Sequence, residues 1–249
     1  CGRKSVVPSI ALKKKYKKQI FNIHIQDPKV SLSNFDTIVC PEHDNLIGPN
    51  VIKTVGSIHY LTMDEIRKNS HYLKIEKENK KIVSFIIGGP NKYYSFSESH
   101  IDKMFNQIKT LFMPDKYKLI VIPSYRTPKE IINKAHNAFS HNHLVIKKID
   151  KQAYLSSLNL ADIIVVTCDS TSMISEAAIT SKPIYIAKME AKRNNYRFEN
   201  FYSKFKEMKI IKDLDTYQEG VDLWTYNKLD ETQRIVPLIK ERMKNNGII

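Results

Sequence analysis

Two patterns of apolar residues alternate along the chain: short continuous apolar runs, and longer stretches in which apolar positions recur every three or four residues. The first pattern predicts buried strands and the second predicts helices. We expect strands at 20–25, 37–40, 51–55, 82–87, 118–123, 144–147, 161–167 and 184–187, and helices at 6–16, 98–112, 128 onward, 152–158, 170 onward, 198–208 and 230–244. This alternation is typical of an α/β fold with parallel sheets.

A polar, Lys- and Glu-rich stretch at 57–80 separates two such runs and suits a connection between domains. The sequence therefore predicts a partial N-terminal α/β domain at 1–60, a linker at 61–80, a C-terminal α/β domain at 81–228, and a helix at 229–249 that packs back on the first domain. Because the chain begins with Cys1, and residues 1–5 read as a strand end entering a helix, we expect the first domain to be truncated at its N-terminus.

The most informative segment is ADIIVVTCDSTSMISEAA, which runs from Ala161 to Ala178. It predicts a buried strand that passes directly into hydroxyl-rich residues and then into a helix. A helix N-terminus presents unpaired N–H groups and partial positive charge, and it lies here at the sheet edge where such folds bind ligands. The candidate ligand-binding residues are Asp169, Ser170, Thr171, Ser172, Met173, Ser175 and Glu176.

Helix capping is the alternative interpretation of this segment, because Asp, Ser and Thr are the preferred N-cap residues of any helix. One cap needs one side chain, however, and the segment offers five. Glu176 does not stand three residues after a Ser or Thr cap, as a capping box requires. We therefore expect Glu176 to serve a ligand group such as a ribose diol.

Two further loops are predicted to reach the same edge of the sheet. The glycine pair of the first would let the backbone approach a diphosphate, its lysine would supply charge, and the arginine of the second can hold a phosphate in a fork. An ordinary glycine turn and a surface salt bridge are the alternatives. The candidate residues are Gly88, Gly89, Pro90, Asn91, Lys92, Ser124 and Arg126.

Acidic and basic side chains also follow the strands of the first half. Asp27 follows one strand, and Glu42, His43 and Asp44 follow the next. An imidazole between two carboxylates suits a general base with a tuned pKa, so His43 and Asp44 are the catalytic candidates. A turn or helix cap is the simpler explanation of Asp27 and Asp44 taken singly.

The formal net charge of +14 is compatible with three kinds of binding partner: a nucleic acid, an anionic membrane surface or a phosphorylated ligand. The basic residues are scattered over the helices, so we expect no nucleic-acid partner. One cluster, at 13–18, leaves peripheral membrane contact open. The three cysteines lack metal-ligand spacing, and no apolar segment approaches the roughly 20 residues of a membrane span. We expect a cytoplasmic protein with reduced thiols and no metal or cofactor.

Seven motifs, taken together and in order, carry a resemblance to a known family. They are Gly2-Arg3-Lys4-Ser5, Gln26-Asp27-Pro28, Phe35 to Asp44, Gly48-Pro49-Asn50-Val51, Gly88 to Lys92, Arg126-Thr127-Pro128 and Ala161 to Ala178. The combination spans nearly the whole chain and resembles the mitochondrial-fission ELM family, which was first named for elongated mitochondria in plants and is widespread in alphaproteobacteria.

The resemblance implies a GT-B-like fold, in which two Rossmann-like domains face across a cleft and the C-terminal one holds a nucleoside diphosphate sugar. The glycine pair would then approach phosphate, Ser170 to Ser175 would line the diphosphate and sugar, and Glu176 would reach the ribose. The N-terminal side of the cleft would contain Gly2, Arg3, Asp27 and Glu42.

The chain departs from the family's pattern at three places. It has Tyr125-Arg126 where two arginines usually precede Thr-Pro, it differs at 150–154, and it has Thr180-Ser181-Lys182-Pro183 where Thr-Gly-Lys-Pro is usual. These changes weaken the assignment of the loop at 150–154 to a ligand. The resemblance implies a glycosyltransferase or, from the role of the plant relatives in mitochondrial fission, a non-catalytic adaptor that recruits partners at a membrane surface.

Overall fold

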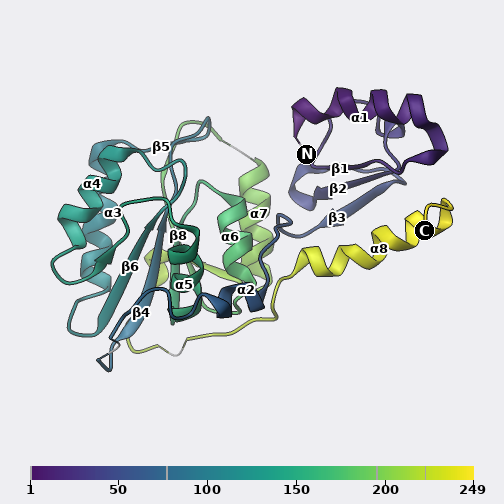
Figure 1. The fold of residues 1–249 in the computed structure, drawn as a ribbon. Coiled ribbons are helices and arrows are strands. Elements are labelled where there is room, and N and C mark those ends of the chain that lie inside the picture. Colours follow the sequence, from purple (N-terminus) through teal and green to yellow (C-terminus); the bar gives the residue numbers. More distant parts are fainter. Residues whose placement is uncertain (1, 77, 195, 222) are drawn as a thin grey trace. The chain divides into compact units, whose positions relative to one another are not determined.

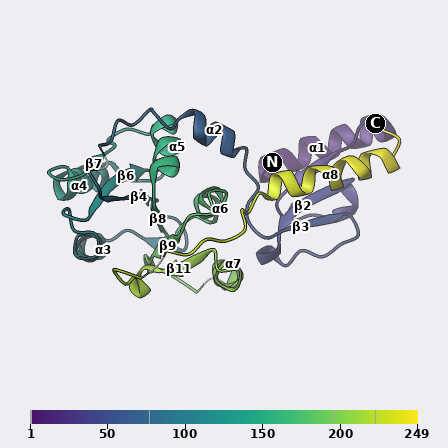
Figure 2. The same cartoon turned by 90° about the horizontal axis from the view of Figure 1, so that it is seen from below.

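The computed structural model describes residues 2–76, 78–194, 196–221 and 223–249, and it divides the chain into two compact units. Unit 1 comprises 1–60, 196–201 and 230–249, and unit 2 comprises 61–195 and 202–229. Helix α7 (Tyr196–Glu207) contributes its first six residues to unit 1 and the rest to unit 2. Each unit is built on a parallel sheet with helices on its faces (Figures 1 and 2).

Unit 1 is a three-stranded parallel sheet between two helices. Its elements are α1 (Arg3–Tyr16), β1 (Ile23–Ile25), β2 (Thr37–Pro41), β3 (Val51–Thr54) and α8 (Glu231–Asn245), with strand order β1-β2-β3 and short 3-10 turns at 17–19, 32–34 and 42–44. Successive strand residues face opposite sides of a sheet. Ile38 therefore packs with Val6 of α1, while Val39 packs with Ile235 of α8 on the other face.

Unit 2 is a six-stranded parallel sheet with strand order β11-β9-β8-β4-β6-β7. Its strands are β4 (Lys81–Ile87), β6 (Tyr117–Pro123), β7 (Leu144–Val145), β8 (Ile163–Thr167), β9 (Ile184–Ala187) and β11 (Ile211–Asp213), and its helices include α3 (Glu98–Leu111), α4 (Lys129–Phe139), α5 (Lys151–Leu160) and α6 (Thr171–Ala178). Figure 2 shows α3 and α4 on one face of the sheet and α5 and α6 on the other.

The strands of unit 2 are apolar because helices cover both faces. All five residues of β8 are buried, as are six of the seven in β4. Polar residues appear where the strands end, and they start the next helices: Asp150 caps α5 and Ser170 caps α6. The predicted α/β fold with parallel sheets is thereby confirmed.

Some elements differ from the sequence-based expectation. The first strand is shorter than the predicted 20–25: it begins only at Ile23, a few residues after the 3-10 turn at 17–19. Residues 61–80, which the sequence suggested as a linker, belong to unit 2, where α2 (Met63–Lys68) contacts α5. The sequence analysis missed β11 and the two-residue strands β5 (Tyr94–Ser95) and β10 (Glu190–Ala191).

Candidate functional site

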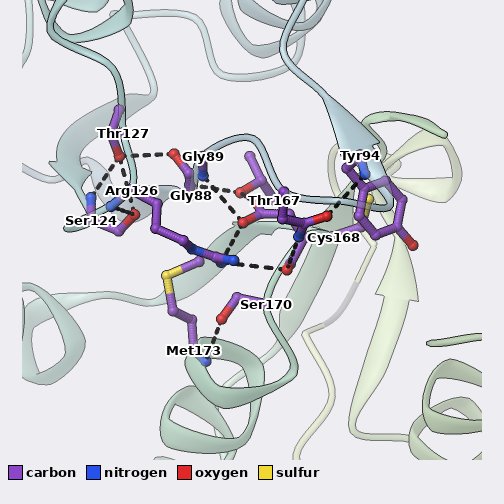
Figure 3. A network of polar contacts seen from close by, with 12 residues as sticks. Gly88, Gly89, Tyr94, Ser124, Arg126, Thr127, Thr167, Cys168, Ser170 and Met173 are labelled. Atoms are coloured by element: carbon purple, nitrogen blue, oxygen red, sulfur yellow. Dashed lines mark hydrogen bonds and ion pairs between the residues drawn. The ribbon is translucent and has the colours of Figure 1, made fainter. Parts of the chain in front are cut away.

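Three loops meet at the carboxyl edge of the sheet in unit 2, after β4, β6 and β8 (Figure 3). The Gly88 N–H donates to Thr167 Oγ1 over 2.8 Å, which joins the first loop to the end of β8. Thr127 Oγ1 lies 2.7 Å from the carbonyl of Ile87 and 2.8 Å from that of Gly88, which joins the second loop to the first. The structure thus brings together the three loops that the sequence singled out.

The meeting point of these loops coincides with the reversal of strand order. From β4 the chain passes outward to β6 and β7, then returns to β8 on the other side of β4 and continues to β9 and β11. The crossovers after β4 and β8 therefore leave in opposite directions. Open α/β sheets bind ligands at this switch point, outside the carboxyl ends of the strands.

Asp169 holds the three loops together from within. Its side chain is buried, with 1% of the residue exposed. One oxygen accepts a hydrogen bond from Thr167 Oγ1 at 2.6 Å, and the other accepts from the Gly89 N–H at 3.1 Å and from Arg126 Nη2 at 2.6 Å. Burial raises the pKa of the Asp169 carboxyl, while these donors and the guanidinium charge act to lower it. The carboxylate that the sequence assigned to a ligand is thus occupied by protein groups.

The two glycines of the first loop are required by this packing. A Cβ at Gly88 would lie 2.1 Å from Asp169 Oδ1, and a Cβ at Gly89 would lie 1.8 Å from the carbonyl oxygen of Arg126. Both distances are far below van der Waals contact. The protein itself, without a phosphate, therefore explains why both positions lack a side chain.

Arg126 is the cation at the centre of the three loops. One guanidinium nitrogen binds the Asp169 carboxylate and lies 3.4 Å from the Asp169 carbonyl, while 42% of the side chain stays exposed. Because a guanidinium carries five N–H donors, Arg126 keeps donors for an anion while Asp169 fixes its position. Ser124 has a local role: its hydroxyl lies 3.2 Å from Thr127 Oγ1 and accepts from the Arg126 N–H.

Helix α6 begins at the centre of this edge. Ser170 caps it, accepting a hydrogen bond from the Met173 N–H at 3.4 Å. The first-turn N–H groups of a helix lack intrahelical partners, so those of Thr171 and Ser172 are available to an anion. Ser172 is exposed. Ser175 is buried and its hydroxyl donates to the Thr171 carbonyl at 2.8 Å, so it serves the helix itself.

Glu176 has a partner that the sequence analysis did not identify. Tyr154, in α5, donates its hydroxyl to Glu176 Oε2 over 2.8 Å. The sequence analysis had set the region 150–154 aside because it departs from the family's pattern. The signal available in the sequence was a tyrosine hydroxyl in the first turn of α5, the helix that precedes the motif strand. Tyr154 orients the carboxylate that was expected to reach a ribose.

The remainder of the first loop forms a tight turn. Asn91 Oδ1 accepts from the N–H groups of Tyr93 and Tyr94, and Asn91 Nδ2 donates to the Asp169 carbonyl at 3.0 Å. The Lys92 ammonium lies 4.5 Å from the centroid of the Tyr93 ring. Pro90 is exposed. Asn91 therefore anchors the turn to α6.

The catalytic candidates lie in unit 1, in the 3-10 turn at 42–44. His43 is 5% exposed, its ring packs edge-on against Phe201, and burial lowers its pKa. Neither of its ring nitrogens has a hydrogen-bond partner among the described residues. Asp44 forms an ion pair with Arg197 and accepts from the Cys40 thiol at 3.6 Å. His43 is therefore a neutral imidazole at neutral pH.

The other candidates of unit 1 have local structural contacts or are exposed. Asp27 pairs with Lys29 at 2.5 Å, and Glu42 is exposed. Gly2 adopts φ of 80° and its carbonyl accepts from Ser5, so it shapes the start of α1. The Arg3 side chain lies outside the described residues. That these residues line a cleft stays a prediction.

Comparison with known proteins places the chain beside two relatives. A family profile described as Mitochondrial fission ELM1 matches residues 1–243. The chain is 22% identical to the mitochondrial fission protein ELM1 of Arabidopsis thaliana, over 99% of this chain and 64% of that protein. It is 25% identical to an uncharacterized protein of Rickettsia prowazekii (strain Madrid E), over 98% of this chain and 79% of that protein.

Solved structures resemble the chain in fold. A putative UDP-N-acetylglucosamine 2-epimerase from Listeria monocytogenes matches with a TM-score of 0.54 and 10% identity, over 97% of this chain and 79% of that one. The S. aureus protein MnaA, solved with UDP, matches with a TM-score of 0.50 and 13% identity, over 99% and 79%. The predicted GT-B-like fold of Rossmann-like units is confirmed. No helix among the described residues is both long and apolar enough to cross a membrane.

Proposed function

The chain belongs to the mitochondrial fission ELM1 family, and we propose that, within its GT-B-like fold, unit 2 binds a nucleoside diphosphate sugar. The motifs predicted this family, and the similarity to the Rickettsia protein supports an alphaproteobacterial-type member. Because the chain spans 64% of the Arabidopsis protein, the activity of the whole protein is part of the proposal.

One observation carries the proposal: α6 begins at the switch point of the sheet with Arg126 beside its first turn. The helix N-terminus offers main-chain N–H groups and positive potential, and Arg126 adds a guanidinium that Asp169 holds in place. Both features are suited to a diphosphate. Glu176, oriented by Tyr154, is one turn further along α6, where it can accept from the hydroxyls of a ribose. UDP, the ligand in the MnaA structure, is of the same class.

Glycosyl transfer is the reaction that we propose for this ligand. Breaking the bond between sugar and diphosphate places negative charge on the leaving oxygen, which α6 and Arg126 would stabilise. The acceptor hydroxyl must lose a proton, and His43 is the better of the two candidate bases. Its imidazole is neutral, whereas the Asp44 carboxylate is paired with Arg197.

Calorimetric titration with UDP, GDP, CDP and their sugars tests the binding proposal. We expect micromolar affinity for at least one nucleotide and a loss of about fivefold in Ser172→Ala and Glu176→Ala, because each variant removes one hydrogen bond. Ser99→Ala and Glu207→Ala, which alter exposed residues elsewhere in unit 2, are the matched controls. Failure of every nucleotide to bind would refute the proposal.

A second function, an adaptor at an anionic membrane surface, is favoured by one observation on α1. The exposed face of this helix presents Val7, Leu12 and Tyr16 beside Lys14 and Lys15, and the chain has no acidic residue before position 27. Apolar residues flanked by lysines are typical of interfacial helices.

The basic cluster at 13–18 is smaller than the sequence suggested, because Lys13 turns inward to Asp36 at 2.7 Å. Co-sedimentation with phosphatidylserine vesicles should therefore fall in Lys14→Glu/Lys15→Glu and at high salt, and persist in Lys13→Gln. Unchanged sedimentation in the double variant would exclude this function.

A further inference from the structure

A small antiparallel ribbon in unit 2 carries positive charge next to the proposed ligand site. It consists of residues 91–95 and 190–193, and we call it the basic ribbon. Tyr94 pairs with Ala191 and Ser95 with Glu190, and the Lys192 N–H donates to the Tyr93 carbonyl at 2.7 Å. Main-chain hydrogen bonds therefore hold the two strands of the ribbon together.

Three cations gather at one end of the basic ribbon. Lys92 Nζ and Arg193 Cζ lie 4.5 and 5.0 Å from the centroid of the same Tyr93 ring. Arg193 Nε donates to the Lys92 carbonyl at 3.2 Å, and Lys192 Nζ donates to the Asn91 carbonyl at 3.3 Å. Among the described residues, no carboxylate forms an ion pair with any of the three. Only neutral dipoles and one aromatic ring offset their mutual repulsion.

Elsewhere on the same segment, a lysine is neutralised. Lys188 pairs with Asp215 at 2.9 Å and lies 3.5 Å from Asp213. Glu190, the acidic residue of the ribbon, accepts hydrogen bonds from the hydroxyls of Ser95 and Ser97 instead of pairing with the three cations. The unneutralised charge is therefore specific to the end of the ribbon that holds Lys92, Lys192 and Arg193.

This end of the ribbon is attached to the turn from which α6 begins. The carbonyl of Asp169 accepts from Asn91 Nδ2 at 3.0 Å, and Arg126 Nη2 lies 3.4 Å from the same oxygen. The Lys192 ammonium binds the main chain of that same Asn91. Arg126 and Lys192 are thus connected through the hydrogen bond between the Asn91 side chain and the Asp169 carbonyl, immediately before α6 begins.

We propose that Lys192 and Arg193 hold the outer phosphate of the diphosphate whose inner part lies on α6 and Arg126. This rests on the proposed function and names two binding residues beyond its motifs. The outer phosphate carries one negative charge in the sugar form and more in the free diphosphate, and the three cations have no carboxylate partner among the described residues, so they can bind it.

Calorimetric titration of the whole chain with UMP and UDP, GMP and GDP, and CMP and CDP tests the proposal in Lys192→Gln and Arg193→Gln. We expect each variant to weaken the diphosphate about tenfold, the equivalent of about 1.4 kcal/mol, and to change monophosphate affinity less than about twofold. Lys188→Gln is the matched control, because it removes the same charge from the same segment but from an ion-paired lysine.

Each other outcome overturns the proposal. Unchanged diphosphate affinity in the variants would show that the protein binds nucleotides without the basic ribbon. An equal loss in Lys188→Gln, or an equal loss for mono- and diphosphates, would show an effect of net charge alone. If the unaltered chain binds no diphosphate, the proposed function fails and the role of the ribbon fails with it. Circular dichroism verifies that the variants remain folded.

Discussion

Removal of the Asp169 carboxylate should destabilise unit 2 strongly. Asp169→Ala leaves three donors without their acceptor: the Thr167 hydroxyl, the Gly89 N–H and one nitrogen of Arg126. Breaking a buried charged pair on one side costs about 3–5 kcal/mol, because the remaining partner is left uncompensated. We expect a cost in the lower half of this range, since the Arg126 side chain is 42% exposed and regains water.

Asp169→Asn removes the negative charge of the side chain but keeps its shape. The amide oxygen can still accept from Gly89 and Arg126, and its NH2 can face Thr167 Oγ1, which already accepts from the Gly88 N–H. The hydroxyl proton of Thr167 then loses its acceptor, and the bond to Arg126 loses its charge. We expect a cost of about 1–3 kcal/mol, less than that of the alanine variant.

Fluorescence of Trp224 during urea unfolding measures these costs. Trp224 is the only tryptophan, it belongs to unit 2, and its ring centroid lies 5.2 Å from that of Tyr185 in β9. Asp64→Ala is the matched control, because Asp64 is an exposed carboxylate of the same unit and its loss should change stability by less than about 0.5 kcal/mol. A cost below about 1 kcal/mol for Asp169→Ala would refute the assignment of Asp169 as the residue that holds the loops.

Three further predictions concern neighbouring residues. Gly89→Ala should cost about 3 kcal/mol in the same unfolding assay, because its Cβ would meet a main-chain oxygen at 1.8 Å; a loss below about 0.5 kcal/mol would contradict this packing. Burial lowers the pKa of His143 from 6.5 to about 4, so the unfolded chain takes up a proton first and stability falls as pH drops from about 6.5 to about 4. The loss should reach about 3 kcal/mol, and His143→Gln should lack it when the two proteins are compared over this pH range. Tyr154→Phe should weaken nucleoside diphosphate binding several-fold by calorimetry, because Glu176 loses the donor that orients it; unchanged affinity would remove Tyr154 from the site.

The position of the candidate site could be predicted from the sequence because it depends on topology. In a parallel sheet the carboxyl ends of all strands share one edge, so polar loops after three buried strands had to come near one another. The runs at 82–87, 118–123 and 163–167 are mostly apolar, which defined where each loop begins. For these loops, the pattern of apolar residues in the sequence was sufficient to predict their position.

The contacts within the site could not be predicted in the same way. The pairing of Arg126 with Asp169 depends on the register between β6, β4 and β8, which the burial pattern of strands buried on both faces does not encode. The basic ribbon depends on two strands of two residues each, too short for any periodicity, whose pairing joins positions 95 and 190. Both features arise from long-range geometry that a single sequence leaves open.

The side chains of the hydroxyl-rich segment at the start of α6 have two different roles. Thr167, Asp169 and Ser175 are buried and bind protein groups, while Thr171 is half-buried and Ser172 is exposed. A phosphate at a helix N-terminus is held chiefly by main-chain N–H groups, and their direction depends on the turn that precedes the helix. Substitution of the buried Asp169 should therefore weaken ligand binding more than substitution of the exposed Ser172, although Ser172 is the one that would touch the ligand.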